Sequence, residues 1–227
     1  MVIPLRDTIR SRSFPFVTIG LLALNVLVFL KQLDAGALGE RLIFAYGLVP
    51  ARLVHWSELG GPPGLARYLP LLTSQFLHGG WLHLLGNLLY LWVFGANVED
   101  RLGHLKYLLF YLACGVIAGL AQVLADPASP VPTVGASGAI AGVLGAYLVS
   151  YPRARVLTFV PIFFLPWLVE IPALVFLALW FATQLLMGWF SLGRELTGGV
   201  AWWAHVGGFM AGMLLVNLGG KRRRRPG

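Results

Sequence analysis

Apolar residues fall into six long runs along this chain, separated by shorter polar or proline-containing segments. Runs of fifteen or more residues with almost no charge are typical of helices that cross a lipid bilayer. Because backbone polar groups must be satisfied internally within lipid, we expect an all-α polytopic membrane protein, a six-transmembrane-helix bundle forming one domain over residues 1–227. The expected spans are residues 14–30, 81–97, 105–125, 137–151, 169–190 and 202–218.

The segment between the first two expected helices, residues 31–80, is amphipathic rather than uniformly polar. Aromatic residues recur along it, among them Trp56, Tyr68 and Phe76, and a run of glycine and proline interrupts it at residues 60–64. Such a segment is typical of chain that lies in the interface between lipid and water. We therefore expect a long, membrane-associated first outer loop.

The composition agrees with a membrane protein and argues against a nucleic-acid-binding one. Hydrophobic residues make up 58% of the chain and charged residues 11%, whereas a soluble domain carries about 25% charged residues. The net charge of +8 arises largely from residues 221–225, which hold five of the 17 cationic residues directly after an apolar run. A basic tail in this place anchors a helix end at the cytoplasmic face and attracts anionic headgroups. We expect residues 221–227 to contact membrane lipids and no nucleic acid.

The distribution of basic residues predicts the orientation of the helices. An N-terminus inside places 12 of the 17 Lys and Arg residues on the cytoplasmic side, so both termini are expected to be cytoplasmic. Residues 1–30 also fit a secretory signal peptide, since basic residues precede an apolar stretch. A retained helix is favoured because this stretch is long enough to span a bilayer and further spans follow.

Three polar side chains are expected at one depth within the membrane. Ser137, His205 and His83 each precede a charged residue near the inner end of their helix by 16 residues. At about 1.5 Å of rise per residue, each lies about 24 Å above that end, within a hydrocarbon core about 30 Å thick. The proline-rich segment 126–132 cannot form regular helix, and irregular backbone at this depth requires protein or water beside it. We therefore expect a water-accessible pocket that opens to the outer face.

A serine and a histidine at one level favour nucleophilic hydrolysis. A serine hydroxyl becomes an effective nucleophile when a base takes its proton, and His205 is the candidate base for Ser137. Their helices must pack closely for this contact. Small residues recur every four positions in both helices and let their backbones approach; the glycines among them are Gly138, Gly142, Gly208 and Gly212. Close packing alone also accounts for these glycines, without catalysis.

Hydrolysis of an amide also requires hydrogen-bond donors for the developing oxyanion. The Ser137 backbone N–H lies at an expected helix N-terminus, where negative charge is stabilised. His83 and Asn87 are four residues apart, so they share one helix face and are expected to complete the oxyanion site. His78, just before them, is a further candidate. Because no acidic residue is expected at this depth to orient His205, the sequence predicts a Ser–His dyad.

Other chemistries find no support in the residues. The sequence has no His-Glu-x-x-His stretch for a zinc protease and no pair of mid-membrane aspartates for an aspartyl protease, so we expect no metal and no cofactor. Glu99 and Arg101 are interpreted as a structural pair at the inner boundary. Simpler interpretations remain open, because Ser137 can be a packing residue and His83 and Asn87 can serve only to hydrogen-bond between helices.

Four motifs give the chain a specific likeness to a known family. They are HGGWLHLLGN at residues 78–87, FGANVEDRLG at residues 94–103, GASG at residues 135–138, and Ala204-His205 followed by Gly208 and Gly212. From about Arg67 to Gly212, the chain resembles the rhomboid intramembrane serine proteases.

The resemblance implies a six-helix rhomboid-like bundle of bacterial type in the bacterial cytoplasmic membrane. It implies Ser137 as nucleophile, His205 as base, and His83 and Asn87 at the oxyanion. The implied substrates are single-span transmembrane proteins, whose helices enter sideways and unwind near the cut.

The chain departs from the family pattern at two positions. Many members carry Trp-Arg in the first outer loop, where this chain has Ala66-Arg67, so only Arg67 carries over. Some members place an aromatic residue four positions after the serine, packed against the histidine. Here this position is Ala141, so another residue must hold the imidazole ring.

Two further functions fit parts of the pattern. A catalytically silent rhomboid-like protein would bind transmembrane helices without cleaving them, but such members typically lose the serine or the histidine, and this chain keeps both. A transporter of small polar solutes would also place histidines in a wet intramembrane pocket. It would retain uptake after the loss of Ser137.

Overall fold

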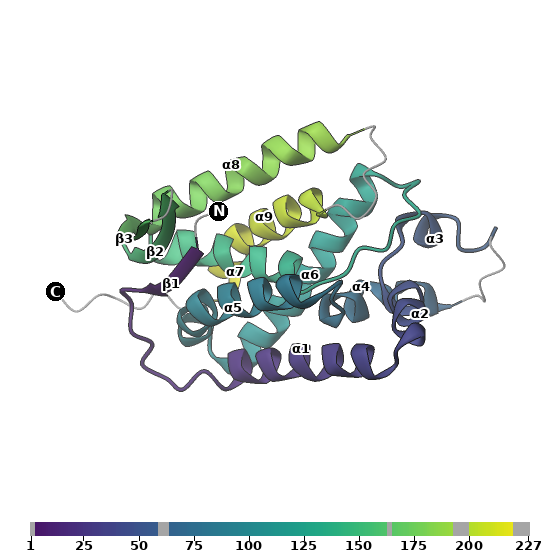
Figure 1. Cartoon of the computed structure of the whole chain (residues 1–227), viewed down its shortest axis with the longest axis horizontal. Coiled ribbons are helices and arrows are strands. Elements are labelled where there is room, and N and C mark those ends of the chain that lie inside the picture. The colour runs from purple at the N-terminus through teal and green to yellow at the C-terminus, as the bar shows by residue number, and fades with distance from the viewer. Residues whose placement is uncertain (1–2, 59–63, 163–164, 193–199, 220–227) are drawn as a thin grey trace.

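The computed structural model describes residues 3–58, 64–162, 165–192 and 200–219, and helices dominate this part of the chain (Figure 1). A helix overlaps each expected span: α1 (Phe16–Asp34), α5 (Trp81–Leu102), α6 (His104–Ala125), α7 (Ser137–Ser150), α8 (Ala173–Ser191) and α9 (Trp202–Gly219). Among the described residues, α1, α5, α6 and α8 are the four helices long and apolar enough to cross a membrane, and α7 is a shorter apolar helix. The mostly helical membrane fold is thus confirmed, while the number of six crossings stays a prediction. The basic tail at 221–227 lies outside the described residues.

Short helices occupy the segment expected to form the first outer loop: α2 (Ala37–Tyr46), α3 (Pro50–Val54), η1 (Leu65–Tyr68), α4 (Pro70–Thr73) and η2 (Ser74–Phe76). Proline begins α3 and α4, where its missing N–H costs nothing. Arg67 holds this segment together: its Nη2 donates to the Leu53 carbonyl at 3.0 Å, and its guanidinium lies 4.9 Å from the ring centroid of Tyr68. The association of this segment with the membrane surface stays a prediction.

A small antiparallel sheet corrects the expectation of an all-α chain. Its strands, in the order β1-β2-β3, are β1 (Ile3–Asp7), β2 (Arg155–Ile162) and β3 (Leu165–Pro172). The helix expected to start at residue 169 therefore starts at Ala173. The physical reason is local, because residues 155–172 combine β-branched and aromatic side chains with three prolines, which favour extended chain and exclude a helix.

Helix α7 forms the centre of the fold. It packs against α5, α6, α8 and α9, and α8 lies along the opposite side of α7 and α9 from α1 (Figure 1). Every residue from Gly138 to Tyr147 is buried, as expected for a helix that is apolar all round. The ring of Tyr147 in α7 meets that of Phe94 in α5 edge to face, with the ring centroids 4.9 Å apart. The central position of α7 means that its first residue, Ser137, starts inside the protein.

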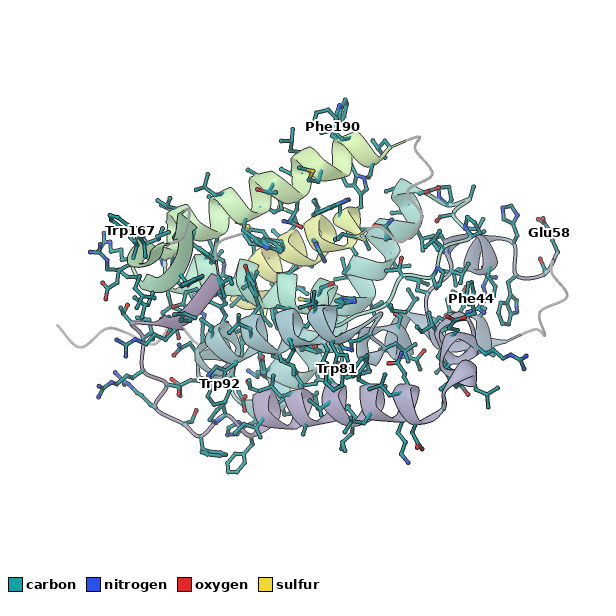
Figure 2. All side chains as sticks on the ribbon, in the orientation of Figure 1. Phe44, Glu58, Trp81, Trp92, Trp167 and Phe190 are labelled. Carbon is teal, nitrogen blue, oxygen red and sulfur yellow. The ribbon has the colours of Figure 1, made fainter. Side chains whose placement is uncertain are left out.

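The contacts of α1 with α5 correct one expected ion pair. Trp81 of α5, labelled in Figure 2, contacts Phe29 of α1 edge to face, with the ring centroids 5.0 Å apart. The Glu99 carboxylate accepts from the backbone N–H groups of Val17 at 2.9 Å and Thr18 at 2.8 Å, and lies 2.6 Å from His104 Nδ1. These N–H groups belong to the first turn of α1, where no intrahelical acceptor exists. The expected pairing of Glu99 with Arg101 was therefore wrong, since Glu99 caps a neighbouring helix and Arg101 donates to a side chain of α9.

Candidate active site

The structure brings the side chains of Ser137 and His205 within hydrogen-bonding distance. Ser137 is the first residue of α7, and His205 lies in the first turn of α9. Ser137 Oγ is 2.8 Å from His205 Nε2, and the histidine side chain is buried. A serine hydroxyl donates to an unprotonated imidazole nitrogen at this distance, which is the arrangement that general-base activation requires.

Glycines allow α7 and α9 to approach closely enough for this contact. A Cβ added at Gly208 would lie 2.0 Å from the backbone oxygen of Gly138, and one added at Gly212 would lie 1.8 Å from the backbone oxygen of Gly142. A Cβ at Gly142 would also meet Cys114 of α6 at 2.4 Å. The four glycines singled out in the sequence therefore lie where α6, α7 and α9 meet.

Side chains of α8 and α9 surround the His205 ring. Gln184 Oε1 of α8 is 2.8 Å from His205 Nδ1. The ring centroids of Trp180 and Trp202 lie 5.8 and 6.3 Å from that of His205. Because position 141 is alanine, the sequence predicted that some other residue holds the His205 ring, but it did not identify Gln184. The available signal was a single amide in an otherwise apolar helix, which is rare unless the amide has a partner.

The backbone turns sharply two residues before Ser137. Gly135 has a φ of +118° and donates its N–H to the Ser74 carbonyl at 2.9 Å. A Cβ added at Gly135 would lie 2.5 Å from His83 Nε2 and 3.5 Å from Asn87 Nδ2. The structure therefore places the two expected oxyanion side chains, both from α5, against the backbone that leads into Ser137.

Both of these side chains present a hydrogen-bond donor. The Asn87 side chain is buried, and among the described residues its Nδ2 has no partner. The Gly79 N–H donates to His83 Nδ1 at 3.4 Å. A neutral imidazole that accepts at Nδ1 carries its proton on Nε2, the nitrogen nearest Gly135. An unpaired buried donor is costly, so Asn87 Nδ2 is suited to an incoming oxygen.

The His78 ring packs between the rings of His83 and Phe29. Its centroid is 5.2 Å from that of His83 and 6.4 Å from that of Phe29. The side-chain amide of Gln32 makes hydrogen bonds of 3.0 Å with both the backbone N–H and the carbonyl of His78. Burial lowers the pKa of His78 to about 4, so the ring is neutral at pH 7. The geometry places the His78 ring against that of His83.

A small pocket lies beside Ser137, and its lining includes Ser74, Gln75, Gly115 and Ala204. It has room for about one water molecule. The part of the chain that the structure describes contains no group of three or more His, Cys, Asp or Glu residues able to hold a metal ion.

Comparisons with known proteins agree with the motifs. The family model described as the Rhomboid domain matches residues 65–222, well over half of the chain. Rhomboid protease GluP of Bacillus subtilis is 36% identical over 135 residues, which cover 59% of this chain and 24% of that protein. Rhomboid protein 1, mitochondrial, of Saccharomyces cerevisiae is 32% identical over 151 residues, which cover 64% of this chain and 40% of that protein.

A further relative covers more of the chain. Presenilin-associated rhomboid-like protein, mitochondrial, of Homo sapiens is 28% identical over 203 residues, which cover 88% of this chain and 47% of that protein. The chain thus spans less than half the length of each of these three relatives. Residues 65–222, which the Rhomboid domain model matches, contain Ser137, His205 and the α5 residues His83 and Asn87. With a matching domain over residues 65–222, this integral membrane protein belongs to the rhomboid family.

Proposed function

We propose that this protein is an intramembrane serine endopeptidase that hydrolyses peptide bonds in or near transmembrane helices. The observation that carries the proposal is the 2.8 Å contact between Ser137 Oγ and His205 Nε2 at the starts of two apolar helices, where His205 is buried and Ser137 is half-buried. The relative GluP, whose name includes the word protease, supports it. The nucleophile is Ser137 and the general base is His205.

The first half of the reaction forms an acyl-enzyme. His205 Nε2 takes the proton of the Ser137 hydroxyl while Oγ attacks the carbonyl carbon of the peptide bond. The negative charge that develops on the carbonyl oxygen is stabilised by the Ser137 backbone N–H, by Asn87 Nδ2 and by the Nε2–H of His83. His205 then donates its proton to the departing amine nitrogen, and the carbon–nitrogen bond breaks.

The second half reverses these roles with water as the nucleophile. The pocket beside Ser137 has room for about one water molecule. His205 takes a proton from this water, whose oxygen attacks the acyl carbon, and returns it to Ser137 Oγ as the ester bond breaks. No metal or cofactor takes part in these steps.

The surroundings of the site suggest the class of substrate and the location. A hydroxyl and an imidazole between apolar helices lie at a depth reached by single-span transmembrane proteins, whose helices must unwind to expose a peptide bond. We place the protein in the bacterial cytoplasmic membrane with both termini cytoplasmic, on the basis of its basic residues and its Bacillus subtilis relative. The mitochondrial relatives make an organelle membrane the alternative.

The test compares Ser137→Ala with the unaltered protein in liposomes that contain a panel of single-span substrates. Cleavage is expected to fall at least about a thousandfold, because no other group replaces the nucleophile. A fluorophosphonate probe is expected to label the unaltered protein and leave Ser137→Ala unlabelled. Ser150→Ala is the matched control, since Ser150 ends the same helix and its hydroxyl donates to the Ala146 carbonyl.

Two results would contradict the proposal. Cleavage at the normal rate in Ser137→Ala would exclude Ser137 as the nucleophile. Substrate binding without cleavage or labelling in the unaltered protein would favour a catalytically silent binder of transmembrane helices.

A further inference from the structure

We propose that Gln184 of α8 is a positioning residue that fixes the tautomer of His205, so that the imidazole presents an unprotonated Nε2 to Ser137. The inference rests on the proposed function and deepens it. In Ser–His–Asp triads a carboxylate accepts the Nδ1–H of the histidine and so orients the ring. Here a neutral amide on a third helix is assigned this role.

The orientation of the Gln184 amide follows from its second hydrogen bond. Its Nε2 donates to the Trp180 backbone carbonyl at 3.0 Å. A carbonyl oxygen can only accept, so the NH₂ group of Gln184 must face Trp180. The other end of the amide, Oε1, then faces His205.

The orientation of the amide determines where the His205 proton lies. Gln184 Oε1 is 2.8 Å from His205 Nδ1, and an amide oxygen can only accept, so Nδ1 carries the hydrogen. A neutral imidazole carries one N–H, which leaves Nε2 with its lone pair. That nitrogen is 2.8 Å from Ser137 Oγ and can take its proton. When His205 becomes protonated, the Nδ1–H bond to Gln184 is retained.

The packing of α8 holds this arrangement in place. Gln184 is 5% exposed, although much of α8 faces outward, as Phe190 does near the end of the helix (Figure 2). The Trp180 ring lies over His205, at an angle of 33° between the ring planes, and limits rotation of the imidazole.

The test removes the acceptor oxygen while keeping the volume of the side chain. Gln184→Met is expected to lower kcat by about ten- to a hundredfold with little change in KM, because the buried Nδ1–H loses its partner and competing tautomers become populated. Gln184→Glu keeps an oxygen toward Nδ1 and is expected to retain activity within about fivefold. Thr183→Val is the matched control on the same helix, since Thr183 is exposed and bonds only within α8. Equal kcat in Gln184→Met and the unaltered protein would overturn the inference.

A second measurement reports the tautomer directly and holds even if the Met variant folds poorly. ¹⁵N-histidine NMR of the full-length protein is expected to show His205 with Nδ1 protonated, with its signals identified by their loss in His205→Asn. The variant Gln184→Glu is expected to keep this tautomer. Protonation at Nε2 in the unaltered protein would overturn the inference.

These results are distinguishable from failure of the proposed function. If the unaltered protein neither cleaves substrates nor reacts with a fluorophosphonate, the proposed function fails. If it does both, and Gln184→Met matches it in kcat, only the role of Gln184 fails.

Discussion

At the scale of single residues, buried polar atoms near the candidate site fall into two groups. The His205 ring has partners on both sides, Ser137 on α7 and Gln184 on α8. Among the described residues, Asn87 Nδ2 and both ring nitrogens of His78 have none. Buried polar atoms without partners are uncommon because each costs free energy. The partnerless atoms of Asn87 and His78 indicate a cost in stability beside the proposed oxyanion site.

His78 predicts a pH dependence of stability. Its pKa in the folded protein, about 4, lies below its ordinary value of 6.5, so the folded state binds fewer protons than the unfolded state between these values. Stability therefore rises with pH from about 4 to 6.5 and is lost as the pH falls, by roughly 3 kcal/mol over the whole interval. Thermal unfolding of the protein in detergent micelles between pH 4.5 and 7.5 measures this slope.

The variant His78→Phe isolates this contribution. It is expected to flatten the dependence of the unfolding temperature on pH, whatever its effect on stability at pH 7. His55→Phe is the matched control, because the His55 side chain is 48% exposed, and it is expected to keep the slope. An identical slope in His78→Phe and the unaltered protein would assign the pH dependence to other groups.

At the scale of elements, the candidate site depends on backbone contact between α7 and α9. Apolar residues lie on every face of both helices, so hydrophobicity alone would allow the helices to slide or rotate against each other. Glycines remove that freedom, because the backbone oxygens of Gly138 and Gly142 occupy the space where the side chains of Gly208 and Gly212 would lie. This contact sets the relative positions of the first turns of the two helices, and with them the distance from Ser137 to His205.

The variant Gly212→Ala tests this dependence. Its Cβ would lie 1.8 Å from the Gly142 oxygen, so the helices must separate. We expect a loss of stability of roughly 3 kcal/mol and a fall in cleavage of about a hundredfold, because small displacements of catalytic groups are costly. Thermal unfolding and substrate cleavage measure the two effects.

Gly20→Ala is the matched control for this variant. Gly20 lies within α1, and a Cβ there would have no atom within 4 Å. Since alanine favours helix over glycine by about 1 kcal/mol, this variant is expected to be as stable as the unaltered protein or more so, with unchanged cleavage. If Gly212→Ala behaved in the same way, close approach of α7 and α9 would not govern the site.

At the scale of the whole molecule, the first strand ties distant parts of the chain together. Asp7 at the end of β1 accepts hydrogen bonds from Asn97 of α5, at 2.7 Å, and from the hydroxyl of Tyr147 of α7. The Thr8 N–H also donates at 3.0 Å to the carbonyl of Arg155, the first residue of β2. Figure 1 shows the resulting sheet at the end of the bundle where β2 and β3 join α7 to α8.

Asp7→Ala is expected to destabilise the protein by about 1–3 kcal/mol, because it leaves the Tyr147 hydroxyl without its acceptor and removes one acceptor of Asn97 Nδ2, which also donates to the Ile9 carbonyl at 3.3 Å. Burial raises the pKa of the Asp7 carboxyl, so its ionised form is disfavoured by folding, and this cost appears as the pH rises. Asp7→Asn keeps an oxygen without the charge and is therefore expected to match or exceed the unaltered protein at pH 7. Thermal unfolding of both variants measures these differences in stability. If Asp7→Ala were as stable as Asp7→Asn, the hydrogen bonds of the side chain at position 7 would not be needed to hold β1 in place.

The residues that meet at the site were largely predictable from the sequence, and the reason is geometric. Along a helix of known rise, distance from a charged end gives depth, and small residues at every fourth position identify the face that packs. Ser137, His205, His83 and Asn87 could therefore be placed near one another before any contact was known. The Rhomboid domain match covers all four positions.

The sequence by itself determined the apolar helices, their small-residue faces and the equal spacing of Ser137 and His205 from the cationic residues that follow their helices, because these properties depend only on the order of residues along the chain. Tertiary structure decided which side chains surround that pair and which strands assemble at the end of the bundle. Gln184 reaches His205, and Glu99 caps α1 rather than pairing with Arg101, because of how neighbouring helices are rotated about their axes. Hydropathy carries little information about that rotation for a helix as uniformly apolar as α8, so only the packed fold reveals what holds the imidazole.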